Sequence, residues 1–280
     1  MDFKILSLIV CICVLTAFAV YIYMQNIIID VEYFDILLKN NRKNSCDLKI
    51  VHISDVHIPN NVVSLDKIFD VLKFEKPDII AVSGDLIYKY KDIDEEKLKN
   101  FCVTLSSVAK TYAVSGNHEI WSHSIQKWTE ILKKSNVSVL DNKIEIFEKE
   151  SQKYEIIGLK ESCSYSEELY NNVKSDENIP KILLSHRPER FEEYYLSLDS
   201  IRPDLVLSGH AHGGQFRIPF IDKALYSPDQ GLFPKYSSGL YVSDNKVQMI
   251  VSRGLSNSFF NVRINNRIHM PVICIRKSCE

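Results

Sequence analysis

The 280-residue chain is poor in several features that would define its class at once. It has no CxxC pair, and its seven cysteines include only one close pair, Cys11 and Cys13, so neither a disulfide framework nor a thiolate zinc site is expected. It has no charge excess, because 34 Lys and Arg residues stand against 36 Asp and Glu residues, for a net charge of −2. A Lys/Arg-rich stripe, the usual electrostatic footprint of a nucleic-acid-binding protein, is also missing. These absences indicate a globular protein with mostly free thiols and no nucleic-acid partner.

Charged residues are missing from residues 5–29, which form one continuous apolar run. The run is long enough to cross a bilayer core of about 30 Å as a helix, and Tyr21 and Tyr23 would suit the far interface. A cleaved signal peptide is the alternative, because Ala17-Phe18-Ala19 resembles a cleavage site. The apolar run continues to Met24 and beyond, which favours a retained anchor. A core helix is disfavoured, because no element of similar hydrophobicity could cover it.

We therefore divide the chain into a membrane anchor or signal segment (residues 1–29), a juxtamembrane linker (30–46) and one α/β domain (47–280). Removal of the first segment is expected to leave a soluble, folded domain. Lys4 favours a cytoplasmic N-terminus and hence an extracytoplasmic domain in a single-pass membrane protein, although the basic residues at 39–43 argue the other way. No twin-arginine signal is present.

The remainder alternates short apolar runs with amphipathic helical patterns, which is typical of α/β layers. Strands are predicted at residues 48–53, 78–82, 111–114, 137–140, 144–147, 154–157, 182–184 and 205–207. Helical spacing is found at residues 65–72, 98–108 and 125–132. From about residue 213 the Gly, Pro and Ser content rises, so long loops are expected to cover a site there.

Metal-ligand residue types follow five of these strands directly. They are Asp55 and His57, Asp85, Asn117 and His118, His186, and His210 and His212. Because sites in open α/β sheets lie beyond the carboxyl ends of the strands, these side chains are expected to converge on one edge. Alternation along a strand predicts that residues i and i+2, such as Asp55 and His57, share one ion. Oxygen and nitrogen donors without thiolate suit Mn, Fe, Zn or similar ions.

The order D-x-H, G-D, G-N-H-E, a later H and then G-H-x-H resembles the calcineurin-like metallophosphoesterase family, over roughly residues 47–275. The stretches SHRPE, GHAHGGQFRIPF, QGLFPKY and VSRGLSNS are similar to its bacterial membrane-associated phosphodiesterase subfamily, which includes relatives acting on UDP-diacylglucosamine. The chain departs from these relatives at Asn266-Arg267-Ile268-His269, where they usually have a Pro and an acid. That departure concerns local C-terminal contacts only.

The resemblance implies a four-layer α/β/β/α sandwich of two mixed sheets, preceded here by the transmembrane helix. It also implies two divalent metal ions, with Mn preferred and Fe, Zn, Mg or Ni as alternatives. Asp55, His57, Asp85 and His212 would hold the first ion, and Asp85, Asn117, His186 and His210 the second, with Asp85 bridging. His118 would be a catalytic group beside the substrate, and Glu119 either an orienting group or a helix cap.

The function implied is a metal-dependent phosphodiesterase or pyrophosphatase that uses metal-activated hydroxide. Its substrate is a phosphate ester, with a lipid-linked one suggested by the anchor. The alternatives are a nuclease of the same fold and an inactive metal-binding interaction module. Gln215, Arg217 and Arg253 are candidate substrate-binding residues, with ordinary structural roles as the alternative. The nearby aromatic residues Phe216, Phe220, Phe233, Phe259 and Phe260 are expected either in the core or facing lipid.

Overall fold

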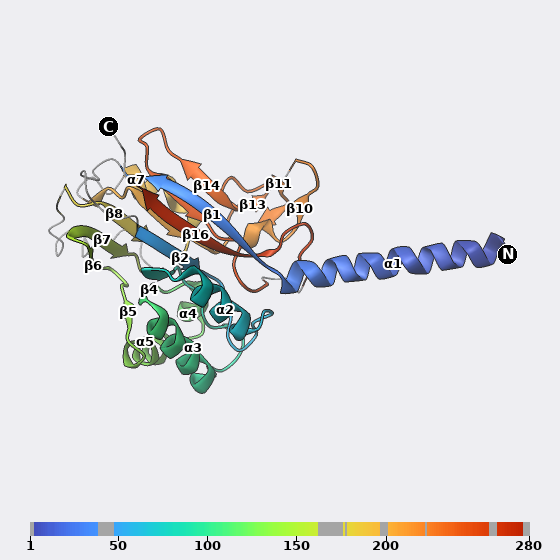
Figure 1. Ribbon diagram of the computed structural model, residues 1–280, viewed down its shortest axis with the longest axis horizontal. Helices are drawn as coiled ribbons and strands as arrows, with labels where there is room; N and C mark the ends of the chain where they lie inside the picture. Colours follow the sequence, from blue (N-terminus) through green and yellow to red (C-terminus); the bar gives the residue numbers. More distant parts are fainter. Residues whose placement is uncertain are drawn as a thin grey trace.

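The computed structural model describes residues 3–38, 48–161, 176, 178–196, 201–221, 223–257 and 262–276. Within these ranges two six-stranded sheets lie against each other (Figure 1). The first has the order β1 (Ile29–Leu37), β16 (Ile268–Arg276), β2 (Leu48–Ile53), β3 (Ile79–Val82), β4 (Lys110–Ala113) and β5 (Val137–Val139). The second has the order β14 (Gly239–Val242), β15 (Gln248–Val251), β9 (Leu205–Ser208), β8 (Lys181–Leu184), β7 (Gln152–Gly158) and β6 (Lys143–Lys149).

Both sheets are mixed, and their parallel parts set the position of the site. Strands β2 to β5 are mutually parallel, as are β7, β8, β9 and β15. The antiparallel pairs are β16–β2, β14–β15 and β6–β7. The parallel strands in each sheet end at a common edge, so the loops that follow them meet there.

Three apolar layers separate the elements. Ile50, Tyr112, Tyr154 and Leu207 belong to the core between the two sheets. A second core lies under α2 (Leu65–Glu75), α3 (Glu95–Val108) and α5 (Ile125–Lys134), which cover the outer face of the first sheet. A third lies between the second sheet and α7 (Phe191–Leu196). This is the expected calcineurin-like four-layer sandwich.

Smaller elements complete the edge that carries the loops. They are α4 (Asn117–Trp121), the short helices η1 (Pro188–Arg190) and η3 (His212–Gly214), and two short hairpins. One hairpin pairs β10 (Arg217–Ile218) with β11 (Lys223–Ala224), and the other pairs β12 (Tyr226–Ser227) with β13 (Gly231–Leu232).

The sequence predicted four neighbouring strands of each sheet and missed the two at one side, which are β1 and β16 in the first sheet and β14 and β15 in the second. Each of the eight predicted strands and each of the three helices is present within a few residues of its expected bounds. The linker expected at residues 30–46 is wrong for its first half, because Ile29–Leu37 forms β1 and pairs with β16 over nine residues. Strand β16 was missed because Pro271 interrupts an otherwise strand-like run, and Pro cannot donate a ladder hydrogen bond. Pro271 is accommodated because the pairing to β2 begins only at Val272.

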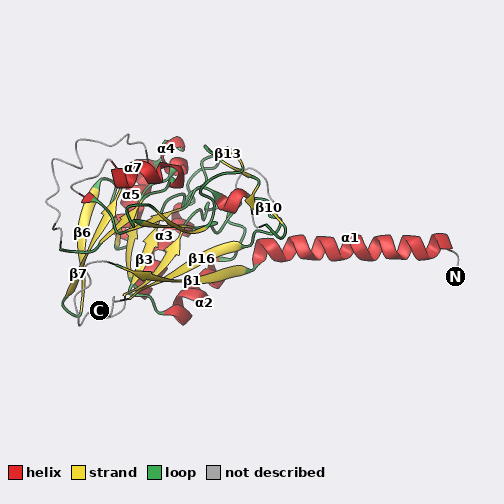
Figure 2. Cartoon of the chain, turned by 90° about the horizontal axis from the view of Figure 1, so that it is seen from above, coloured by secondary structure: helices red, strands yellow, loops and turns green. Residues whose placement is uncertain are grey.

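Helix α1 (Phe3–Ile27) projects from the domain as a single rod (Figure 2). Its most apolar window has a mean hydropathy of 2.8 and no residue of that window is buried, so it is a candidate membrane span and not a core helix. Only its last turns touch the domain. Gln25 Oε1 accepts a hydrogen bond from Asn266 N at 3.1 Å, and Asn26 Oδ1 accepts one from Asn257 Nδ2 at 3.1 Å. Both side chains are buried.

These contacts change the expectation for truncation. We expect a chain lacking residues 1–20 to keep its thermal stability, because Gln25, Asn26 and β1 are retained. A chain lacking residues 1–28 loses both side chains and leaves buried donors without partners, which costs about 1–3 kcal/mol for each group. Its melting temperature should fall by about 2–4 °C for each kcal/mol. Equal melting of the two truncated chains in differential scanning calorimetry would show that the end of α1 is not part of the domain.

Candidate metal centre

Five of the eight ligand-type residues after the strands share an unusual backbone conformation. The backbone φ angle is positive at Asp55 (53°), His57 (57°), Asp85 (55°), His210 (65°) and His212 (48°). Non-glycine residues rarely adopt this left-handed conformation, and such strain concentrates at functional sites. Asp55 and His57 do lie together, as strand alternation suggested, but for another reason: β2 ends at Ile53, and the two left-handed residues turn both side chains inward.

The structure brings the predicted residues into two adjoining groups. Asp55, His57 and His212 each place one ligand atom within 4.8 Å of the others, and so do Asp85, His186 and His210. A third such group of His57, Asp85 and His118 connects them. Asn117 joins the second group, since its Oδ1 lies 3.2 Å from His186 Nε2. Asp85 is therefore the carboxylate common to both sides of the site.

Three histidines are anchored through one ring nitrogen. Nδ1 of His57 donates to the carbonyl oxygen of Asn257 at 3.0 Å, and Nδ1 of His212 donates to that of Ser256 at 3.2 Å. Nδ1 of His186 donates to the carbonyl of Ser83 at 2.8 Å. A carbonyl only accepts, so each Nδ1 carries the proton and each Nε2 keeps its lone pair for a ligand.

The donor set fits a pair of divalent cations. Nε2 of His57 is buried and has no hydrogen-bond partner, although a buried polar atom normally has one. Asp85 Oδ2 lies 3.6 Å from that atom and 3.2 Å from His186 Nε2. A buried carboxylate beside imidazole nitrogens, one of which has no hydrogen-bond partner, is the kind of donor set that divalent metal ions require.

The Asp85 carboxylate is ionised although it is buried. Burial alone would raise its pKa, but the imidazoles of His186 and His118 hold the pKa of Asp85 well below its usual range. The same interaction raises the pKa of His186 against the opposing effect of burial. Asp85 Oδ1 also accepts the His118 backbone N–H at 2.8 Å. The negative charge at the centre of the site is thus set by the fold.

Glu119 holds the backbone of this centre. Its Oε2 accepts the N–H groups of Asp85 at 2.9 Å and Gly116 at 2.7 Å, and its Oε1 accepts that of Ile87 at 3.0 Å. Its bond to Gly116 also closes the capping box of α4. The two roles predicted for Glu119, orienting the site and capping the helix, are therefore performed by one carboxylate.

His118 lies beside the two groups and is oriented differently from the anchored histidines. Its Nδ1 accepts the Lys89 backbone N–H at 3.4 Å, so in the neutral ring the proton is on Nε2, which lies 3.9 Å from Asp85 Oδ2. Its ring stacks on His57 with centroids 4.4 Å apart. Burial, and the positive charge that His57 and Lys89 can carry, lower the pKa of His118 to about 4, despite the opposing effect of Asp85. His118 therefore presents a donor N–H to the site.

Close packing at the strand ends explains one of the glycines. A Cβ atom on Gly209 would lie 1.7 Å from Ser54 Oγ and 2.6 Å from Asp55 Oδ2. Any side chain at this position would displace the Asp55 carboxylate. The glycine is needed here for room and not for a turn.

The three candidate substrate-binding residues have intramolecular partners. Gln215 Nε2 donates to the carbonyl of Val262 at 2.9 Å, and Arg217 Nη1 donates to that of Gly213 at 3.1 Å. Arg253 forms ion pairs with Asp30 at 2.5 Å and Glu32 at 3.4 Å, which tie it to β1. Their role in substrate binding stays a prediction.

Sequence reasoning missed two supports of the site. Arg263 is fully buried and donates to the carbonyls of Arg253 and Ser256 and to Asn257 Oδ1, so it fixes the loop that anchors His57 and His212. Burial lowers its pKa to about 9. An isolated Arg far along the chain gives no motif, and only the fold reveals its role.

The second missed support is Asp229. Its Oδ2 lies 2.7 Å from His210 Nε2 and 2.5 Å from Arg187 Nη1. The hydrogen bond with His210 lowers the pKa of Asp229, as does the Arg187 charge. This carboxylate comes from the hairpin of β12 and β13, in a region where the sequence indicated only loops.

Comparison with known proteins agrees with this geometry. The family model described as calcineurin-like phosphoesterase matches residues 48–214. An uncharacterized metallophosphoesterase of Campylobacter jejuni is 33% identical over 86% of the chain, and the chain spans 62% of that relative's length. The phosphodiesterase YaeI of Escherichia coli is 25% identical over 83% of both chains. A transmembrane protein with metallophosphoesterase domain from Danio rerio is 24% identical over 82% of the chain, which spans 54% of its length.

We expect Asp85→Ala to lose both metal ions, because this carboxylate belongs to the second group and also lies beside His57 of the first. His212→Ala should lose one, since His212 belongs to the Asp55 group alone. Elemental analysis of each purified variant, beside the parent chain, measures the ion count. Two ions retained by Asp85→Ala would contradict the shared position.

Arg263→Lys should weaken one ion more than the other. It removes most of the donors that hold the loop behind His57 and His212, whereas His186 is anchored separately by Ser83. Loss of such a support typically costs 10–100-fold in metal affinity. Titration with Mn²⁺ gives the two affinities, and Arg202→Lys, at an exposed residue bonded to the carbonyl of Asn245, is the matched control. Equal weakening of both ions would contradict this role for Arg263.

Proposed function

Since the chain belongs to the calcineurin-like phosphoesterase family and is a hydrolase of phosphoester bonds, we propose that it is a membrane-anchored phosphodiesterase or pyrophosphatase. The family depends on a dinuclear metal centre, and we propose Mn as the preferred ion. The observation that carries the proposal is the convergence of ligand-type side chains from five strand ends around Asp85.

The proposed ligand sets follow the two groups. Asp55, His57, Asp85 and His212 hold one ion, and Asp85, Asn117, His186 and His210 hold the other. The geometry supports this division, because the two groups of three are separate and Asp85 is within 3.6 Å of a histidine from each. His210 uses Nε2 to bond to Asp229, so Nδ1 is the ring nitrogen left to hold an ion.

When bound, two such cations lower the pKa of water and neutralise charge on a phosphoryl group. The chain itself supplies orientation and a proton. The anchored Nδ1 atoms of His57, His212 and His186 fix the direction of each Nε2. His118 Nε2–H is the donor that faces the same space, so it can donate a hydrogen bond to the leaving oxygen as negative charge develops on it.

We propose a lipid-linked phosphodiester or pyrophosphate as the substrate. Three observations support it: the unburied apolar helix α1, the name phosphodiesterase carried by the Escherichia relative, and the motifs shared with a subfamily that includes relatives acting on UDP-diacylglucosamine. The lone Lys4 in the first turn of α1 supports a cytoplasmic N-terminus and an extracytoplasmic catalytic domain. We propose that this domain extends from Ile29, where β1 begins.

Metal removal tests the dinuclear centre. Chelation of the full chain in detergent should abolish hydrolysis of bis(p-nitrophenyl) phosphate, and Mn²⁺ should restore it more fully than Mg²⁺. Full activity in a preparation shown by elemental analysis to be free of metal would overturn the proposal. Activity on DNA that falls steeply with salt and exceeds activity on lipid diphosphates would instead indicate a nuclease.

His118→Asn should keep both ions and the parent melting temperature while losing activity. A positioned proton donor contributes about 10²–10⁴-fold. The loss should be larger for alkyl than for aryl leaving groups, because more charge develops on a poor leaving oxygen. Hydrolysis rates over a series of leaving groups, together with the metal content of the variant, test whether His118 acts on the leaving oxygen. A missing ion would place His118 among the ligands, and an equal loss for all substrates would remove its role at the leaving group.

A further inference from the structure

Large apolar side chains are exposed on the two short hairpins. Phe220 is fully exposed, and Leu232, Phe233 and Ile221 are exposed by 68%, 60% and 59%. We call these four residues the apolar rim. Lys223, also exposed, lies among them on β11. Single exposed apolar residues are common, but four within fourteen positions of one hairpin pair form a patch that normally has an occupant.

A continuous series of hydrogen bonds connects this rim to the end of α1. Tyr21 Oη accepts the Asn265 backbone N–H at 3.0 Å. The neighbouring Ile264 pairs with the start of β10, since its carbonyl accepts the Arg217 N–H at 3.1 Å. Phe216 in turn accepts from Leu225 N at 2.8 Å, and Leu225 accepts from Phe233 N at 2.9 Å. The rim is therefore held to the helix through backbone hydrogen bonds and the Tyr21 hydroxyl.

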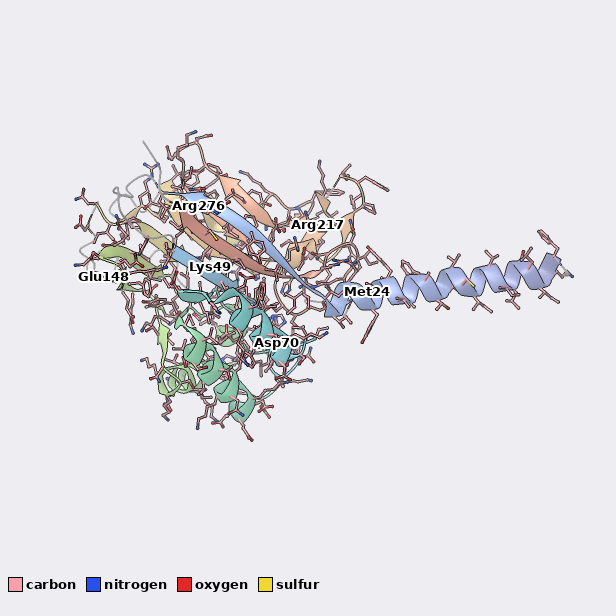
Figure 3. The ribbon with its side chains drawn as sticks, in the orientation of Figure 1. Met24, Lys49, Asp70, Glu148, Arg217 and Arg276 are labelled. Atoms are coloured by element: carbon pink, nitrogen blue, oxygen red, sulfur yellow. The ribbon has the colours of Figure 1, made fainter. Side chains whose placement is uncertain are left out.

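The figures show the same arrangement. In Figure 1 the hairpin strands β10, β11 and β13 lie on the side of the domain from which α1 emerges. In Figure 3 Arg217 lies on that side, near Met24, whereas Glu148 of β6 lies at the far end of the domain. The rim and the end of α1 thus share one face of the molecule.

The length of α1 fixes where a bilayer would end. Residues 3–20 precede the first bonded contact with the domain at Tyr21, and eighteen helical residues span about 27 Å. A bilayer core is about 30 Å thick. The surface of the membrane would therefore fall at the level of Tyr21, which is where the domain face with the rim begins.

We propose that the apolar rim inserts into the interfacial region of the same leaflet from which α1 emerges. The occupant is the lipid bilayer, because the rim lies on the side of the domain from which α1 emerges, and α1 is the only helix in the described residues that is long and apolar enough to cross one. Aromatic and aliphatic side chains with a flanking Lys are typical of such interfacial contacts. This inference concerns binding and does not depend on the proposed reaction.

Tryptophan quenching in vesicles tests the insertion. The full chain is reconstituted in phosphatidylcholine vesicles with and without lipids brominated near the headgroup end of the acyl chains. Phe220→Trp and Phe233→Trp should each add emission that the brominated lipids quench. Ile146→Trp, at an exposed residue of β6 on the far end, is the matched control and should add unquenched emission. Trp121 and Trp128 give the same background in every chain.

The proposal fails if emission at residues 220 and 233 is quenched no more than at residue 146. It also fails if Phe220→Asp shifts the detergent-solubilised chain from dimer to monomer while quenching at 233 is absent, because the rim would then contact a second copy. All four substitutions are at exposed positions, and thermal melting of each chain checks that the fold is retained.

Discussion

The Asp85 carboxylate is the interaction on which the rest of the site depends. It lies within 4 Å of Nε2 atoms from His57, His118 and His186, and it remains negative because those imidazoles offset the cost of burial. Its backbone is in turn fixed by Glu119. A buried charge in this position is stable only with partners, and the imidazoles supply part of what two divalent cations would complete. The strained left-handed residues at the strand ends bring those partners together, and the fold sustains that strain.

The parts of this arrangement that the sequence could predict are those with local signals. Short apolar runs gave the central strands, and the residues directly after them gave the candidate ligands, because strand ends in one sheet share an edge. Strands β1 and β16 had no such signal. The first is amphipathic and follows a membrane segment, and the second contains Pro271, so both depend on their mutual pairing in the folded state. The same holds for Arg263, whose partners are carbonyl oxygens that no sequence pattern marks.

Two residues between β15 and β16, Asn257 and Asn266, contact both the candidate metal centre and the end of α1. Asn257 accepts His57 Nδ1 on its carbonyl, accepts Arg263 on its side-chain oxygen and donates to Asn26 of α1. Asn266 donates to the His212 carbonyl at 2.8 Å while its N–H bonds to Gln25. Two histidines of one candidate ion group are thus one residue away from the helix that leaves the domain. A tilt of α1 would therefore act on the ring of His57 through Asn257 and on the backbone of His212 through Asn266.

For the proposed membrane-spanning role of α1, this connection would fix the position and orientation of the domain as well as attach it. Only Ile28 separates α1 from β1, and β1 is paired along its whole length with β16, so the helix has no flexible linker through which to turn. With α1 in a bilayer as proposed, the height of the domain would follow from the position of Tyr21, and the apolar rim is joined to the same part of the chain through Phe216 and Ile264. A site held rigidly against α1 would suit the proposed lipid-linked substrate, because its phosphate could be reached while the acyl chains of the lipid stay in the bilayer. Extracting those chains would cost about 0.8 kcal/mol for each CH₂ exposed to water. That saving requires a rigid connection between the helix and the site, and the direct passage from α1 into the fully paired β1 supplies it.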